Sequence, residues 1–223
     1  MPSKRKRAAA VTGDLALWQH WIKQLTNGIT TVLVWKEIWK MMATAIDANP
    51  EIPRTLALSY LAMTYSQSQA VAVRRLVDRD PDVISLARLL ESIAAHPHLV
   101  TRAWWVGQHD RLDWRVAAQE WDANFGGKIC DHVDPQIVEE DLRSLLAEAD
   151  KVRTLVNKVV AHRVENYSGP LVTQGDLNAA IDRIGELFQK YYKLLLVADR
   201  ILLPPDLKNV MATFRVPWVP PPE

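Results

Sequence analysis

Three polar side chains near the end of one apolar helical segment carry the strongest chemical signal in the sequence. Within the run 155–163, Asn157, Lys158 and His162 are set among leucine, valine and alanine. Lys158 and His162 are one helical turn apart, so they share a face. A histidine titrates near neutral pH and can act as a general acid or base. The spacing predicts a catalytic cluster of these three residues; the alternative is a histidine that caps the last turn of its helix.

A pair of adjacent arginines gives a second candidate site. Arg74 and Arg75 follow a long uncharged stretch, and Asp78 comes one turn after Arg74. One interpretation is a surface ion pair between Arg74 and Asp78, which is a common and weak interaction. The other is an anion-binding cleft, and on this interpretation we expect Arg74, Arg75 and Arg163 to bind the substrate.

Several familiar motifs do not support cofactor or metal chemistry. The run Gly126-Gly127-Lys128 lacks the spacing and the hydroxyl residue of a phosphate-binding loop. His96-Pro97-His98 and the run 131–134 place metal-ligand types together, but at helix boundaries, where the same residues serve as caps. Cys130 is the single cysteine, which excludes an intrachain disulfide and any multi-cysteine metal site. We expect no cofactor and no bound metal.

Charge and hydropathy favour a cytoplasmic protein. The net charge is +1, and without the basic run Lys4 to Arg7 the chain has 23 basic against 26 acidic side chains. A body of that sign is a poor non-specific binder of nucleic acid, so any RNA contact must be local. The basic run precedes no apolar region of signal-peptide length. The uncharged stretch 55–73 contains serine, threonine and glutamine, which predicts a buried helix and no membrane contact.

Apolar residues recur at helical spacing along most of the chain, which predicts an all-α fold, a helical bundle. We expect a basic tail over 1–12, one helical domain over 13–203 and a proline-rich tail over 204–223. Asn27-Gly28 predicts a helix end, and Asp82 an N-cap. The predicted helices cover 14–27, 29–48, 54–77, 82–95, one or two segments within 99–134, then 135–163 and a last helix from Thr173 to Pro204.

The last two helices are the most regular and should form a long antiparallel pair. Apolar residues from Val138 to Val159 form one seam, and the partner helix begins at a capping-box-like run, 173–176. The short connection between the helices requires the antiparallel arrangement. The seam can be buried within the bundle or in a twofold contact with a second copy of the chain.

The sequence also resembles a known family. The run Asn-Lys-x-x-Ala-His at 157–162 resembles the end of the HEPN motif, in which an arginine, a polar residue and a short spacer precede a histidine. The segments Ala72 to Asp78 and Ser85 to Leu90 resemble the abortive-infection branch of HEPN proteins. In this resemblance Asn157 takes the polar position and His162 the histidine position, whereas the arginine position falls on Val156.

The resemblance implies a helical bundle that dimerises through its motif helices and cleaves RNA without a metal ion. A valine cannot offer a phosphate the charged, bidentate contact of an arginine. Lys158 and Arg153 are candidates to replace it, although Arg153 points to the opposite side of the helix from His162. We therefore expect a bacterial defence or toxin–antitoxin protein, either a divergent ribonuclease or an inactive relative, with RNA, a second copy and an antitoxin protein as partners. The alternative is a non-enzymatic helical protein–protein interaction module.

Overall fold

The last long helix packs against three of the other helices. The computed structural model describes residues 14–53, 55–109, 114–126, 130–157, 172–203, 209 and 212. The helices, in chain order, are α1 (Leu15–Asp47), α2 (Leu56–Leu76), α3 (Leu86–Ala95), a 3-10 turn η1 (Pro97–Leu99), α4 (Arg102–Gly107), α5 (Trp114–Asn124), α6 (Pro135–Leu155) and α7 (Gln174–Leu196). The predicted all-α bundle is confirmed, since the described residues contain no strand.

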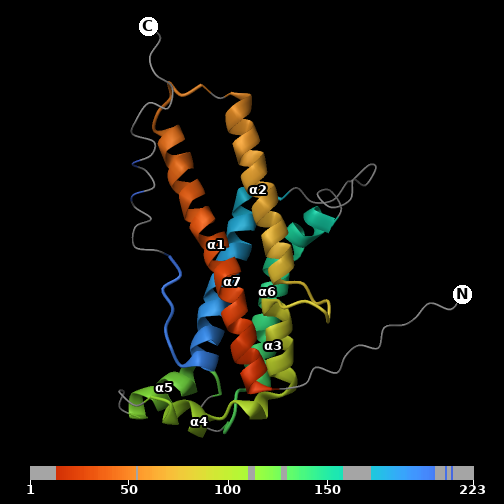
Figure 1. The fold of residues 1–223 in the computed structure, drawn as a ribbon, viewed down its shortest axis with the longest axis vertical. Helices are drawn as coiled ribbons and strands as arrows, with labels where there is room; N and C mark the ends of the chain where they lie inside the picture. The colour runs from red at the N-terminus through yellow and green to blue at the C-terminus, as the bar shows by residue number, and fades with distance from the viewer. Residues whose placement is uncertain are drawn as a thin grey trace, which may run out of the picture.

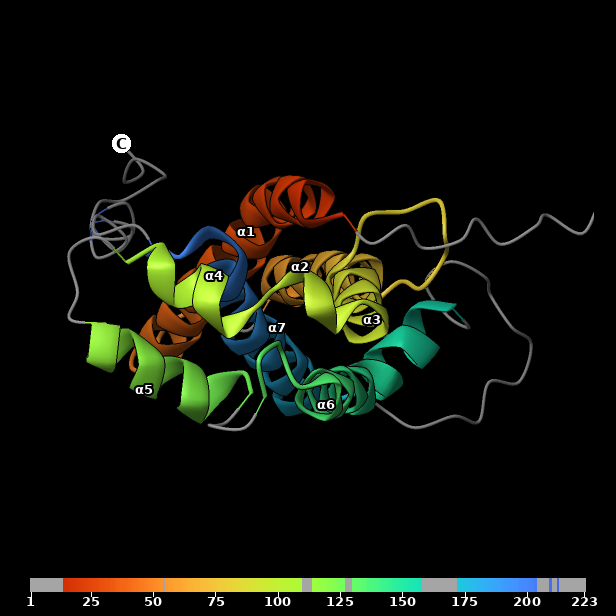
Figure 2. The same cartoon turned by 90° about the horizontal axis from the view of Figure 1, so that it is seen from below.

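Helix α7 packs against α1, α2 and α6 because it is apolar on two adjacent faces (Figure 2). On each of these faces a ladder of apolar residues recurs at seven-residue spacing, and both ladders are buried from Leu177 to Leu195. The capping box at its start is also present, since the Thr173 hydroxyl accepts from Asp176 N and the Asp176 side chain accepts from Thr173 N. The buried ladder residues are Leu177, Ile184 and Tyr191 on one face, and Ile181, Phe188 and Leu195 on the other.

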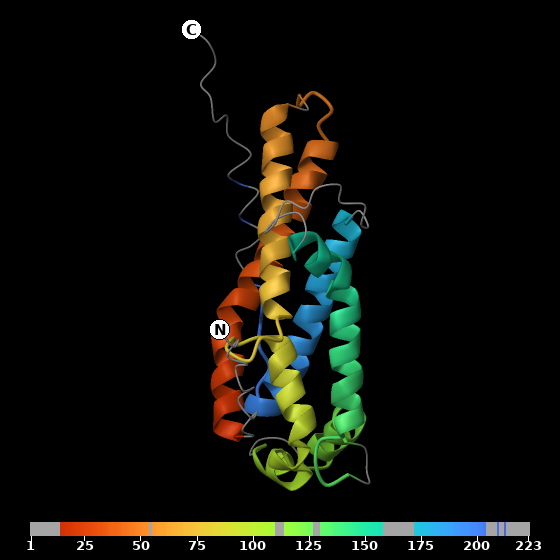
Figure 3. The same ribbon diagram turned by 90° about the vertical axis from the view of Figure 1, so that its right-hand side faces the viewer.

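Helix α6 lies antiparallel to α7, as predicted (Figure 3). Most of the described part of its seam is buried within the chain: Val138, Leu145, Ala149, Val152 and Val156 are each at most 2% exposed. These seam residues are therefore buried by intramolecular packing, whereas Leu142 on the same seam is partly exposed.

Three predicted helix boundaries are wrong. Helix α7 ends at Leu196, where Val197 takes the left-handed backbone conformation (φ 52°), whereas the sequence predicted a helix as far as Pro204. Asn27-Gly28 does not end a helix, because Leu25, Ile29 and Val32 continue the buried stripe of one uninterrupted α1. A single glycine costs a helix only about 1 kcal/mol, which this burial outweighs. Asp82 is not the N-cap of α3; Ser85 is, and its hydroxyl accepts from Arg88 N at 3.1 Å.

Helices α1 and α2 form an antiparallel hairpin whose tip extends beyond the ends of α6 and α7 (Figures 1 and 3). The short helices α4 and α5 lie at the opposite end of the bundle. Several large apolar side chains on the hairpin are exposed, with Leu56 at 89%, Tyr60 at 63% and Trp35 at 53%. None of the helices that the structure describes combines the length and the apolar character of a membrane span.

The carboxylate of Asp141 on α6 is buried and binds three donors from α7. It accepts from Lys190 Nζ at 2.6 Å, from Tyr191 Oη at 3.0 Å and from Arg183 Nη2 at 3.1 Å. Burial, and then the negative charge of Asp141, raise the pKa of Tyr191 well above its ordinary value, so the phenol stays a donor.

Replacing Asp141 by alanine should destabilise the fold by about 3 to 5 kcal/mol, because it removes the buried counter-ion of Lys190 and one of the two carboxylates that pair with Arg183. Urea unfolding followed by circular dichroism measures the loss. Glu186→Ala is the matched control, since it removes an exposed carboxylate that also pairs with Arg183. Equal stability of the two variants would contradict the structural role of Asp141.

Asp176 should make the stability of the pair α6–α7 sensitive to acid. Hydrogen bonds from Lys151 and Thr173 hold the pKa of its carboxyl well below the ordinary value. A carboxyl whose pKa is lower in the folded state than in the unfolded state stabilises the fold fully above about pH 4. This contribution decreases as the pH falls from about 4 toward the lowered pKa of the folded state. Asp176→Asn should therefore be less stable than the wild type at pH 7, with a difference that shrinks below pH 4. Urea unfolding across this range measures it; Asn178→Ala, on the same turn, should keep a constant difference.

Candidate functional site

The structure brings together two of the residues that the sequence singled out. Arg74 lies in the last turn of α2, and Asn157 follows the end of α6. The Nε of Arg74 donates to Asn157 Oδ1 at 2.8 Å, across 83 positions of sequence. A polar residue of the predicted catalytic cluster thus contacts a predicted substrate-binding arginine.

Asp78 holds the guanidinium of Arg74 from the other side. Its Oδ2 accepts from Arg74 Nη1 at 3.2 Å, which confirms the expected ion pair. Asp78 itself is fixed by the loop that follows α2, since its Oδ1 accepts from Asp80 N at 3.1 Å and its backbone carbonyl accepts from the Ser85 hydroxyl. Arg74 is therefore oriented by two partners, and Nη2 has no acceptor among the described residues.

A small cleft opens beside this pair. It measures about 210 Å³, and its border consists of three arginines, two aspartates, an asparagine and a valine: Arg74, Arg79, Arg153, Asp78, Asp80, Asn157 and Val77. Arg79 pairs with Glu91 and Arg153 with Asp150, and both side chains remain substantially exposed. Three guanidinium groups around one polar hollow can attract an anion, and a planar guanidinium matches the oxygens of a phosphate. Arg79 was not predicted from the sequence.

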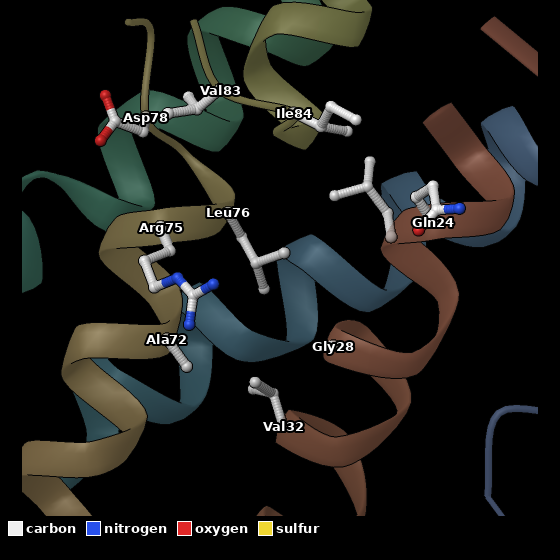
Figure 4. A pocket seen from close by; sticks show the side chains of 10 residues that line it. Gln24, Gly28, Val32, Ala72, Arg75, Leu76, Asp78, Val83 and Ile84 are labelled. Atoms are coloured by element: carbon white, nitrogen blue, oxygen red, sulfur yellow. The ribbon is translucent and has the colours of Figure 1, made fainter. Parts of the chain in front are cut away.

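Arg75 lies on a different side of α2 from Arg74 and lines a different cavity. Successive residues of a helix differ by about 100° in direction. Arg75 consequently borders a cavity of about 400 Å³ between α1 and α2, opposite Gly28 and Val32 (Figure 4). The two arginines do not converge on one cleft.

The remaining residues of the predicted cluster, Lys158, His162 and Arg163, lie outside the described residues. Val156, which takes the arginine position of the HEPN motif, is described and is 2% exposed. Its side chain belongs to the same packed core as Val152. The position therefore lies in the interior of the bundle and does not border the cleft.

The histidines considered as metal ligands take part in local structure. His132 forms an isolated backbone bridge with Thr101, and its Nδ1 lies 2.8 Å from the carbonyl oxygen of Val133. The rings of His96 and His98 are 6.3 Å apart. Within the described ranges, no three histidine, cysteine, aspartate or glutamate side chains are close enough together to hold a metal ion.

Comparison with known protein families gives a match over most of the chain. The HEPN_AbiU2 family model, described as AbiU2, matches residues 17–209. No curated protein and no solved structure matches the sequence.

Substitution of Val156 by arginine tests whether this position can open to a phosphate. Burial of an unpaired guanidinium costs several kcal/mol, which is of the order of the stability of a whole domain. Val156→Arg should therefore lose its cooperative thermal transition in circular dichroism or melt far below the wild type. Glu148→Arg, exposed on the same helix, is the control and should melt normally. A Val156→Arg protein of wild-type stability would show that the position is accessible.

Proposed function

The chain belongs to the AbiU2 family of HEPN proteins, of the abortive-infection type, and from this premise we propose that it is a divergent, metal-independent endoribonuclease of bacterial defence. The hydrogen bond between Arg74 and Asn157 carries the proposal. Through this bond the guanidinium of Arg74 lies beside Asn157, the polar residue of the motif. Arg74 could therefore provide the positive charge that Val156, at the arginine position of the motif, does not provide.

In this proposal Arg74 binds the scissile phosphate. Its free Nη2 donates to a non-bridging oxygen, and Asn157 and Asp78 keep the guanidinium in position. A fixed cation of this kind stabilises the negative charge that develops in the transition state. Arg79 and Arg153 on the cleft wall attract the neighbouring phosphates of the strand.

His162 performs the proton transfer. The ribose 2′-hydroxyl gives its proton to a solvent water and attacks phosphorus, the bond to the 5′-oxygen breaks, and the imidazolium gives its proton to that oxygen. The products are a 2′,3′-cyclic phosphate and a 5′-hydroxyl. This chemistry needs the 2′-hydroxyl, so the substrate class is RNA. Lys158, four positions before His162 in the sequence, adds positive charge, and Arg163 adds a further phosphate contact.

The same proposal includes the partners expected from the sequence. A second copy of the chain would place two motif helices side by side, and an antitoxin protein would cover the cleft. The protein would act on RNA in the cytoplasm.

A second candidate function is a non-enzymatic interaction module. The observation that favours it is the burial of Val156, because the arginine position of the motif is occupied by a core residue. In this case the cluster at the end of α6 serves only to end the helix, and the exposed apolar side chains of the α1–α2 hairpin contact another protein.

Incubation of the purified chain with total RNA in the presence of EDTA separates the two functions. The ribonuclease proposal expects cleavage that leaves cyclic phosphate ends, that is lost in His162→Ala, and that falls roughly 100-fold or more in Arg74→Gln. Arg143→Gln is the control and should cleave normally, because Arg143 is exposed on α6 and lies about four helical turns before Asn157. Intact RNA at high protein concentration would favour the module, and full activity in Arg74→Gln would remove Arg74 from the mechanism.

A further inference from the structure

An apolar groove runs between α1 and α2 on the side of α1 that faces away from α7. Leu33 and Lys36 of α1 contact α7, through Gly185 and Asp182 respectively. At 100° per residue, Trp35 and Ile38 lie on the opposite side, and they line the groove. Its volume is about 680 Å³, which is within the range of small-molecule sites.

The groove is apolar along most of its length and cationic at one end. Its walls include Trp39 and Tyr65, whose rings stack at 4.8 Å, and Leu61 lies at the end near the hairpin tip. Arg75 lies at the other end, about four helical turns or roughly 21 Å from Leu61 along α2. Among the residues that the structure describes, Arg75 is the single charged one that lines this groove. It makes no ion pair with any described residue, and Figure 4 shows it reaching from α2 toward Gly28 of α1.

The shape of the groove suits one extended alkyl chain. The groove follows α2 for roughly 21 Å, and apolar side chains line most of that length. The floor is formed by the buried residues Val32, Tyr65 and Gln69.

The charge at the end of the groove determines what an occupant must carry. The described lining contains no carboxylate, and Arg75 makes no ion pair with any described residue. Burial of an unpaired cation is unfavourable, so an occupant that covers Arg75 must bring its own anion. A second copy of the chain has Glu37 and Asp47 on its own α1, so this occupant is one that the test must separate.

We propose that the groove between α1 and α2 binds the monomeric anion of a long-chain carboxylic acid. Its alkyl chain lies along Ile38, Trp39, Met42 and Leu61, and its carboxylate pairs with Arg75, with the amide of Asn27 beside it. This site is separate from the cleft at Arg74 and does not depend on RNA cleavage.

Isothermal titration of the full chain with dodecanoate, below its micelle concentration, tests the site. We expect one equivalent to bind, and decanoate to bind more weakly by roughly fourfold for each methylene removed. Dodecyltrimethylammonium, which has the same chain and the opposite charge, should not compete. Equal affinity for all chain lengths, or equal binding of the cation, would overturn the proposal.

Two variants localise the binding. Arg75→Gln should weaken dodecanoate binding about tenfold or more, because a charge-assisted contact is lost. Gly28→Leu should abolish it without harm to the fold, since a Cβ at this position meets nothing within 4 Å and replacement of a helix-interior glycine favours the helix. Arg74→Gln, the neighbouring arginine that faces α6, is the matched control and should bind normally.

Two further outcomes would also overturn the proposal. If dodecanoate binds Gly28→Leu and the wild type equally, the ligand lies elsewhere. If the wild type sediments as a dimer that Gly28→Leu converts to a monomer, the groove is an interface between copies. Loss of RNA cleavage in Arg74→Gln with unchanged dodecanoate binding would leave this site intact and keep it distinct from the proposed ribonuclease.

Discussion

The buried carboxylate of Asp141 determines how α6 lies against α7. It accepts hydrogen bonds from Arg183, Lys190 and Tyr191, which lie along one side of α7 over more than two turns. Sliding α6 by a single turn would break all three contacts and leave buried or partly buried polar groups unpaired, which apolar packing alone would not penalise to the same extent. The regular apolar seams supply most of the burial, and this polar cluster selects one register among the alignments that those seams would allow.

The register of α6 then decides what its end can contact. Because α6 is held along α7, Asn157 comes to lie beside the last turn of α2 and binds Arg74. The loop after α2 contributes Asp78, whose carboxylate is fixed by backbone and side-chain donors. A cation held by two partners keeps its direction when an anion arrives, which is the preorganisation that electrostatic catalysis requires. The cleft is thus a consequence of helix packing and involves no special local motif.

The hairpin of α1 and α2 projects past the other long helices of the bundle (Figure 1). Their lower halves pack against α7, α6 and α3, whereas the tip of the hairpin extends past these helices (Figure 1). Gly28 contributes to the groove because it omits a side chain where α1 faces Arg75, yet it does not interrupt the helix. Two neighbouring arginines on α2 therefore serve two separate surfaces: Arg74 faces the end of α6, and Arg75 faces α1.

The sequence alone determined the all-α class, the extent of α2, the capping box of α7 and the ladders that α7 buries, because apolar spacing and caps act within a few residues of one another. It also indicated the family, through the run 157–162 and the segments near Arg74. The helix end predicted at Asn27-Gly28 was wrong, because burial of the apolar residues around it outweighed the low helix propensity of glycine. Only the tertiary structure decided that Arg74 meets Asn157, that Val156 is core and that Arg75 faces a separate groove, because contacts across 83 positions depend on how whole helices pack and leave no periodic trace in the chain.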